Sequence, residues 1–351
     1  MRTRFTAGIA LLGLLTSLPL LAQESSAPPD ELETVVVTGE RPGPGLWKIS
    51  KGDHVMWVLG TYTPLPKNMT WRSQSVEARI AESREVLLPP SVNVDMGLGF
   101  FRTLTLIPAM IRAVKLPDKK TLQDVLPPET WRKWQYLRNR YMGNNNTSAE
   151  RLRPSMAVSI LRDQAYKRNW LTDGPVVESI VKSAAKKHKV RVRSVHDVEP
   201  KMKTKSGDIR DAIASIADMS DVECFTRDLD QLEPDIELLK QRANAWATGD
   251  VEALRHLHEK PDIVSAFDDV FEAAVTGGDS AKAARLKQIG DEYDALEAQG
   301  KVKAEQDWIA AASKALEKNQ STFALLPIRE VVGVEGYVAK MRELGYEVEG
   351  Q

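Results

Sequence analysis

The chain has 351 residues, of which 42% are hydrophobic. This length allows one large domain or two ordinary ones with a substantial buried core, and the composition excludes a disordered polypeptide. The 48 basic and 49 acidic side chains leave a formal net charge of -1. No global positive charge therefore favours nucleic acid or an anionic bilayer, and we expect no nucleic-acid partner.

Residues 1–22 have the layout of a secretory signal peptide. Arg2 and Arg4 precede an uncharged apolar run from Phe5 to Ala22, with small residues and proline near its end. A retained membrane anchor is the alternative, because this run is near the lower limit for spanning a bilayer. We predict cleavage after Ala22, a periplasmic or secreted location, and no integral membrane segment after signal cleavage.

Residues 23–44 predict a flexible linker. Their sequence, QESSAPPDELETVVVTGERPGP, is polar and proline-rich apart from a short β-branched run at Thr34–Thr38. Within it, ETVVVTG (Glu33–Gly39) resembles the TonB box of outer-membrane receptors, an extended strand that pairs with the edge of a partner's sheet. A short ordered edge strand without a partner is the alternative interpretation.

The first folded elements are predicted to be strands. Residues 46–50 (LWKIS) and 54–60 (HVMWVLG) read as two strands, and the Lys-Gly-Asp between them is typical of a β-hairpin. In residues 75–83 (SVEARIAES) the apolar side chains recur four apart, which predicts a helix. The apolar EVLLPP at 85–90 predicts a further buried strand.

From residue 96 onward the pattern is mostly helical. Residues 100–114 (FFRTLTLIPAMIRAV) are apolar on several faces. Helices of that kind are usually buried, so we predict a core or interdomain helix, with an exposed helix for a partner or membrane surface as the alternative. Residues 175–195 read as a helix followed by a strand, and residues 207–317 as a long helical run.

The C-terminal part returns to strands. Residues 321–328 (STFALLPI) predict a buried strand, residues 334–346 a helix, and residues 347–350 a last short strand. Because strands come from both ends of the chain and helices fill the middle, the sequence predicts an α/β (α+β) fold. We expect a mixed central sheet with a large helical middle region.

Histidine is scarce among the side chains that could carry chemistry. His256 and His258 are two apart in a helical segment, so they point to nearly opposite sides, while His54 in a hairpin and His188 at a lysine-rich helix end are expected to be exposed. His196 stands with Asp197 and Glu199 at the end of a predicted strand, where sites often form. A hydrogen-bonded structural histidine is the simpler interpretation of His196.

Several blocks resemble the TraB/GumN family, which is related to the Tiki metalloproteases. They are GLWKIS, VLGTYTPLP and SVEARIAESREVLL near the start, RLRPSMAVSIL and GPVVESIVKSAAKKHKVRVRSVHDVE in the middle, and TFALLPIREVVGVEGYVAKMRELGYEVE at the end. The resemblance covers roughly residues 45–350. It implies one TraB/GumN-like domain over residues 45–351, with the Tiki-like fold.

The resemblance also implies where a metal site would lie. Family members with a proposed site carry Gly-x-x-His after the first core strand, an acidic residue after the second, and another Gly-x-x-His after the last. Here Gly60 is kept, but Thr63, Pro89 and Arg329 stand at the ligand positions, and His196 lies in place of a usual glutamate. A hydroxyl is a weak ligand, and proline and guanidinium offer no lone pair, so we expect a degenerate pocket without metal or cofactor.

Two functions follow from these residues. The first is a catalytically inactive pseudo-metallohydrolase that binds a peptide or protein partner in the old cleft, where Arg329 could grip a carboxylate. The alternative is a metal-dependent hydrolase or peptidase with a relocated site at His196, Asp197 and Glu199. The sequence leaves the ligand and the oligomeric state open.

Overall fold

The computed structural model describes residues 43–350, except 68, 70, 98–99, 145, 204, 219–220 and 259–280. The predicted signal peptide, most of the predicted linker and its segment Glu33–Gly39 lie outside the described residues.

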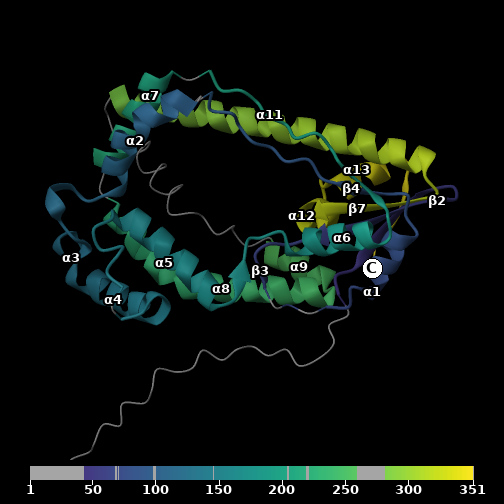
Figure 1. The fold of residues 1–351 in the computed structure, drawn as a ribbon, viewed down its shortest axis with the longest axis horizontal. Coiled ribbons are helices and arrows are strands. Elements are labelled where there is room, and N and C mark those ends of the chain that lie inside the picture. The colour runs from purple at the N-terminus through teal and green to yellow at the C-terminus, as the bar shows by residue number, and fades with distance from the viewer. Residues whose placement is uncertain are drawn as a thin grey trace, which may run out of the picture. The chain divides into compact units, whose positions relative to one another are not determined.

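Strands from the two ends of the chain form one mixed sheet with the order β6-β4-β7-β2-β1-β8. In Figure 1 the purple N-terminal strands and the yellow C-terminal strands therefore belong to the same sheet. The predicted α/β (α+β) class is confirmed. The strands are β1 (Leu46–Lys51), β2 (His54–Thr61), β4 (Glu85–Leu88), β6 (Arg191–Ser194), β7 (Ser321–Pro327) and β8 (Glu347–Glu349), and a separate two-stranded sheet pairs β3 (Leu65–Pro66) with β5 (Leu171–Thr172).

The predicted hairpin at the start of the sheet is present. Strands β1 and β2 pair antiparallel with Lys51 opposite His54. Gly52 in the turn has a φ of +64°, a left-handed conformation that glycine adopts without a steric penalty. The Lys-Gly-Asp signal therefore fixed both the position and the register of the hairpin.

Helices supply most of the middle of the chain. The helices, including the short 3-10 helix η1, are α1 (Gln74–Ala81), α2 (Phe100–Val114), η1 (Pro117–Lys119), α3 (Leu122–Val125), α4 (Pro128–Met142), α5 (Pro154–Arg168), α6 (Val176–Lys187), α7 (Ser206–Asp218), α8 (Val222–Thr248), α9 (Val251–His258), α11 (Ala281–Lys318), α12 (Ile328–Val332) and α13 (Tyr337–Glu343). None of the helices in the described part of the chain combines the length and apolar character needed to cross a bilayer.

Two large apolar clusters stabilise these elements. One surrounds the six-stranded sheet, with Trp246, Trp308 and Phe323 fully buried in it. The other joins α3, α4, α5 and the N-terminal part of α8, around Trp134 and Phe225. Because α8 contributes to both clusters, this one helix connects the sheet to the helical region.

The prediction that α2 is buried was wrong for most of its surface. Leu106 is only 2% exposed, but Leu104, Ile107, Met110 and Ile111 are 45%, 42%, 48% and 51% exposed. Helix α2 packs against α7 through one side. Its apolar character extends beyond the side that finds a neighbour, so the alternative of an exposed helix holds.

Candidate functional site at the carboxyl edge of the sheet

Four parallel strands bring the predicted pocket positions to one edge of the sheet. Strand β7 pairs parallel with β2 and β4, and β4 pairs parallel with β6. The carboxyl ends of parallel strands share an edge, where ligands commonly bind in α/β sheets. Thr63 follows β2, Pro89 follows β4, His196 follows β6, and Arg329 lies just after β7.

The strand order divides these four positions. Thr63, Arg329 and Pro89 follow three adjacent strands, whereas His196 follows the next strand outward. At a strand spacing of about 4.8 Å, the ends of β2 and β6 are about 14 Å apart. The three positions where the resemblance implies metal ligands are therefore neighbours at the edge, and His196 is peripheral to them.

The turn after β2 is held by core contacts. The Gly60 carbonyl accepts a hydrogen bond of 2.8 Å from the indole Nε1 of Trp246, and the Thr61 hydroxyl donates to the Leu326 carbonyl at 3.2 Å. A Cβ atom on Gly60 would lie 2.3 Å from Cδ1 of Ile328, the first residue of α12. Close packing of α12 on β2 therefore explains the glycine.

The side chains that this edge presents are poor metal ligands. Thr63 is exposed between the buried residues Tyr62 and Leu65. Arg329 has a side chain that is 68% exposed, and its Nε contacts Oε1 of Glu330 at 3.3 Å. Thr63 and Arg329 thus offer a neutral hydroxyl and a cation to the surroundings.

His196 lies beside a cavity of about 770 Å³. Asp197 and Glu199 line the same cavity, together with Lys303 and Asp307 of α11. The residues of the alternative site therefore do converge. Thr63, Pro89 and Arg329 are not among the described residues that line it, so this cavity does not unite the predicted positions.

The chemistry available beside His196 is limited. Asp197 accepts a hydrogen bond from the backbone N–H of Ser91 at 2.9 Å, which lowers the pKa of Asp197 below its ordinary value. A general base working near neutral pH would need a raised pKa instead. Within the described ranges, no group of three or more His, Cys, Asp or Glu side chains is arranged to hold a metal ion.

Two other histidines can be compared with their predicted environments. His188 ends α6 and is exposed, as predicted. His54 is half-buried, and its Nδ1 lies 2.5 Å from the carbonyl oxygen of Leu316. The prediction of an exposed His54 was wrong because the end of α11 packs beside the hairpin.

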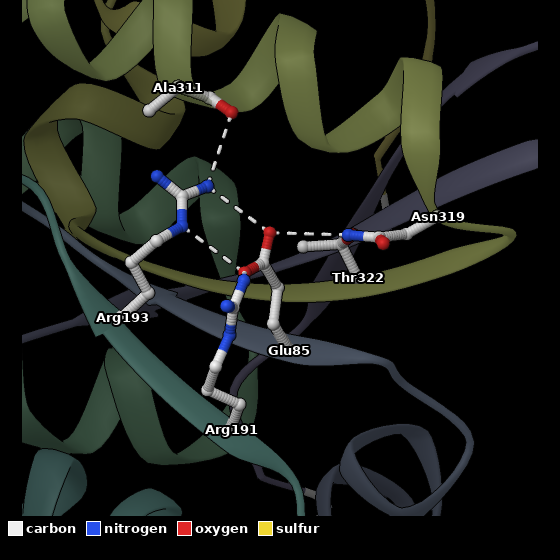
Figure 2. Close-up of polar contacts among 6 residues, drawn as sticks. All are labelled: Glu85, Arg191, Arg193, Ala311, Asn319 and Thr322. Atoms are coloured by element: carbon white, nitrogen blue, oxygen red, sulfur yellow. Dashed lines mark hydrogen bonds and ion pairs between the residues drawn. The ribbon is translucent and has the colours of Figure 1, made fainter.

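The sequence analysis missed a buried ion cluster at the opposite end of β4. Glu85 is 3% exposed. Arg193 donates to both of its carboxylate oxygens at 3.1 Å, Arg191 donates at 2.7 Å, and Asn319 donates at 3.2 Å. Figure 2 shows the Arg193 guanidinium between this carboxylate and the Ala311 carbonyl of α11. The cluster joins β4, β6 and α11.

The charge of Glu85 is stabilised by its partners. Burial raises the pKa of Glu85, but the hydrogen bonds from Arg193 and Arg191 together outweigh it and hold the pKa below the ordinary value of 4.5. The available sequence signal was the spacing of Arg191 and Arg193, which puts both on one face of a strand. Nothing local showed that Glu85 would lie opposite them.

Comparison with known proteins identifies a family over nearly the whole described chain. The model of the TraB/PrgY/gumN family matches residues 45–350. No curated protein and no solved structure gave a match.

We expect Glu85→Gln to lower the free energy of unfolding by about 1–3 kcal/mol at pH 7, because it leaves two arginines without their carboxylate. The folded-state pKa lies below the unfolded value, so the stabilisation is present above about pH 4.5 and is lost as the pH falls through the folded pKa. Urea unfolding at pH 7 and pH 3.5 should show the two proteins converging at the lower pH.

The matched control for Glu85 is Glu349→Gln. Glu349 pairs with Lys48 at 3.0 Å, but its side chain is 65% exposed, so its loss should cost about 0–1 kcal/mol. Equal costs for the two substitutions, or a Glu85→Gln cost that does not change with pH, would contradict the role of the cluster.

We expect Gly60→Ala to lower the free energy of unfolding by about 1–3 kcal/mol through overpacking against Ile328. In an Ile328→Val background, which removes Cδ1, the same substitution should cost less by more than about 0.5 kcal/mol. Thermal unfolding of the four proteins measures this coupling. Gly207→Ala is the control, because a Cβ there meets nothing within 4 Å; additive effects at Gly60 and Ile328 would count against the packing explanation.

Proposed function

The chain belongs to the TraB/PrgY/gumN family, and we propose that it is an exported member without metal-dependent activity that works by binding a peptide or protein. The observation that carries the proposal is the residue set at the carboxyl edge of the sheet. Thr63, Pro89 and Arg329 follow three adjacent strands at the positions where the resemblance implies metal ligands. None of the three is a good ligand for a transition metal.

Electrostatics adds to this argument. Arg329 is a permanent cation beside the edge. At an effective dielectric of 20, two unit charges about 4 Å apart interact by about 4 kcal/mol, and a divalent ion roughly doubles that repulsion. The same guanidinium favours a carboxylate, which it can bind through two parallel hydrogen bonds. Its exposed side chain and single contact with the neighbouring Glu330 leave the fork accessible.

A hydrolase site beside His196 is the second candidate function. It is favoured by one observation, which is that His196, Asp197 and Glu199 line a common cavity. The lowered pKa of Asp197 argues against a base at that position. If the protein is a hydrolase with its site beside His196, the substitution His196→Gln should abolish peptide hydrolysis.

Metal analysis separates the two functions. After incubation with Zn²⁺ or Mn²⁺ and gel filtration, we expect much less than one ion per chain, and no peptidase activity that a chelator abolishes. The control is a Thr63→His, Arg329→His variant, which restores two imidazoles at adjacent strands and should retain more metal than the parent. A stoichiometric ion in the parent, or cleavage that is sensitive both to chelators and to His196→Gln, would refute the binding-protein proposal.

Peptide binding tests the role of Arg329. On an immobilised peptide library, we expect stronger binding to peptides with a free C-terminal carboxylate than to the same peptides with an amidated C-terminus. Arg329→Gln should lower the affinity for the free-carboxylate peptides about tenfold and so remove this preference. A loss of that size is in the range expected for a hydrogen bond to a charged group. Arg342→Gln is the control, because Arg342 is an exposed arginine on α13. A preference that survives Arg329→Gln would exclude the proposed contact.

A further inference from the structure

A second cavity, of about 1000 Å³, lies at the C-terminal half of α2, and none of the four carboxyl-edge residues is among its described lining. The segments around it are η1, α3, and the starts of α5 and α8, together with α7. It is lined on one side by apolar groups, namely Pro108, Ala109, Ile111, Leu116 and Val125. Neither the family resemblance nor the proposed function uses this cavity.

Backbone hydrogen bonds fix its walls. The Leu116 N–H donates to the Arg151 carbonyl at 3.1 Å, and the Arg153 N–H donates to the Val114 carbonyl at 2.9 Å. These bonds join the end of α2 to the start of α5. On the other side, α2 packs against α7, so the cavity is built from connected elements.

The cavity is positively charged. Among the described residues that line it, five are cationic and two are anionic. One of the acids, Asp221, is 3% exposed and accepts a hydrogen bond of 2.8 Å from the Ser155 N–H at the start of α5. The Asp221 carboxylate therefore already has partners within the fold, because Nη1 of Arg153 also lies 3.9 Å from its Oδ1.

Four of the five cations are not paired with an acid in this way among the described residues. In the part of the chain that the structure describes, no ion pair joins a carboxylate to Arg112, Lys115, Lys120 or Arg210. They come from α2, the segments on either side of η1, and α7. The lining therefore keeps an excess of positive charge over Asp211 and Asp221, and a bound anion would reduce the repulsion among its cations.

The apolar wall continues onto the exposed face of α2. Leu104, Ile107 and Ile111 follow the i, i+3, i+7 spacing of one helix face, and each is more than 40% exposed. Ile111 belongs both to this face and to the cavity wall. The structure therefore places a cationic cavity directly beside an exposed apolar strip, Leu104, Ile107 and Ile111.

We propose that this cavity binds an anionic amphiphile, a single molecule with a carboxylate or phosphate head and an alkyl chain. The head lies among Arg112, Lys120 and Arg210, and the chain lies over Ile111 toward Leu104 and Ile107. Such a ligand satisfies the charge and the apolar strip together. Each CH₂ group that it buries contributes on the order of fourfold in affinity.

Two other anionic ligand classes fit less well. A peptide would place backbone N–H and C=O groups against Pro108, Ala109 and Ile111, whose side chains cannot form hydrogen bonds with them. A nucleic acid would lack stacking partners, because no aromatic side chain is among the described residues of the lining.

The test is calorimetric titration of the full chain at low salt with monomeric dodecanoate and dodecyl phosphate, below their micelle concentrations. Dodecanol, butyrate and inorganic phosphate supply the chain or the head alone. We expect both amphiphiles to bind at least about tenfold more tightly than any of these three. Dodecanol binding as well as dodecanoate, or inorganic phosphate as well as dodecyl phosphate, would overturn the proposal.

Charge removal locates the site. A variant with Arg112→Gln, Lys120→Gln and Arg210→Gln should lose at least about tenfold in affinity for dodecanoate. The control carries Lys186→Gln, Lys318→Gln and Arg342→Gln, which removes the same charge from exposed residues elsewhere and should bind as the parent does. Equal losses in the two variants would show a nonspecific charge effect and refute the site.

A single substitution tests the apolar wall at Ile111, whose side chain is 51% exposed and therefore contributes little to the packed core. Ile111→Ser should weaken dodecanoate binding several-fold and leave inorganic phosphate unchanged. Anionic phospholipid vesicles are the last arm of the test. Binding to vesicles without binding to the monomeric amphiphiles would overturn the cavity proposal in favour of a membrane surface.

Discussion

The parallel insertion of β7 between β2 and β4 is the constraint on which the rest of the structure depends. Residues Thr322–Leu326 of this strand are fully buried, and their partners on β2 and β4 lie 266 and 237 residues earlier in the chain. Until β7 arrives, β2 and β4 have no common edge. The loop that carries Thr63 and the loop that carries Pro89 become neighbours only through this strand, whose long-range pairing makes a slow folding step.

The Glu85 ion cluster and the cationic cavity beside α2 have different roles. At Glu85 two guanidinium groups share one carboxylate, and the hydrogen bonds hold β6 and α11 against β4. Removing one partner there leaves a charge in a partly buried place, so the cluster is a structural element. Around the α2 cavity the described lining holds five cations and only two acids, and one of these acids, Asp221, is already engaged with Arg153 and the Ser155 N–H. Such an arrangement is better explained by a ligand than by folding.

The sequence predicted those features that depend on neighbouring residues. The hairpin at Gly52, the apolar β7 and the helix-rich middle each follow from local pattern and turn chemistry. The exposed face of α2 was missed because an apolar helix does not reveal how many neighbours it has. Glu85 and the cationic cavity were missed because their partners are distant in sequence. Arg210 and Arg112, for example, line one cavity although no local sequence pattern links the two segments.

At Gly60 and Thr63, the backbone shape of the turn and the chemistry of its side chains have separate causes. The closeness of Ile328 explains Gly60 by packing, so the presence of this glycine says nothing about a metal. Thr63 is different, because it is exposed and its side chain is not needed to fill the core. Packing in the core therefore does not determine the residue at position 63, and a neutral hydroxyl there is a weaker ligand for a metal cation than an imidazole would be.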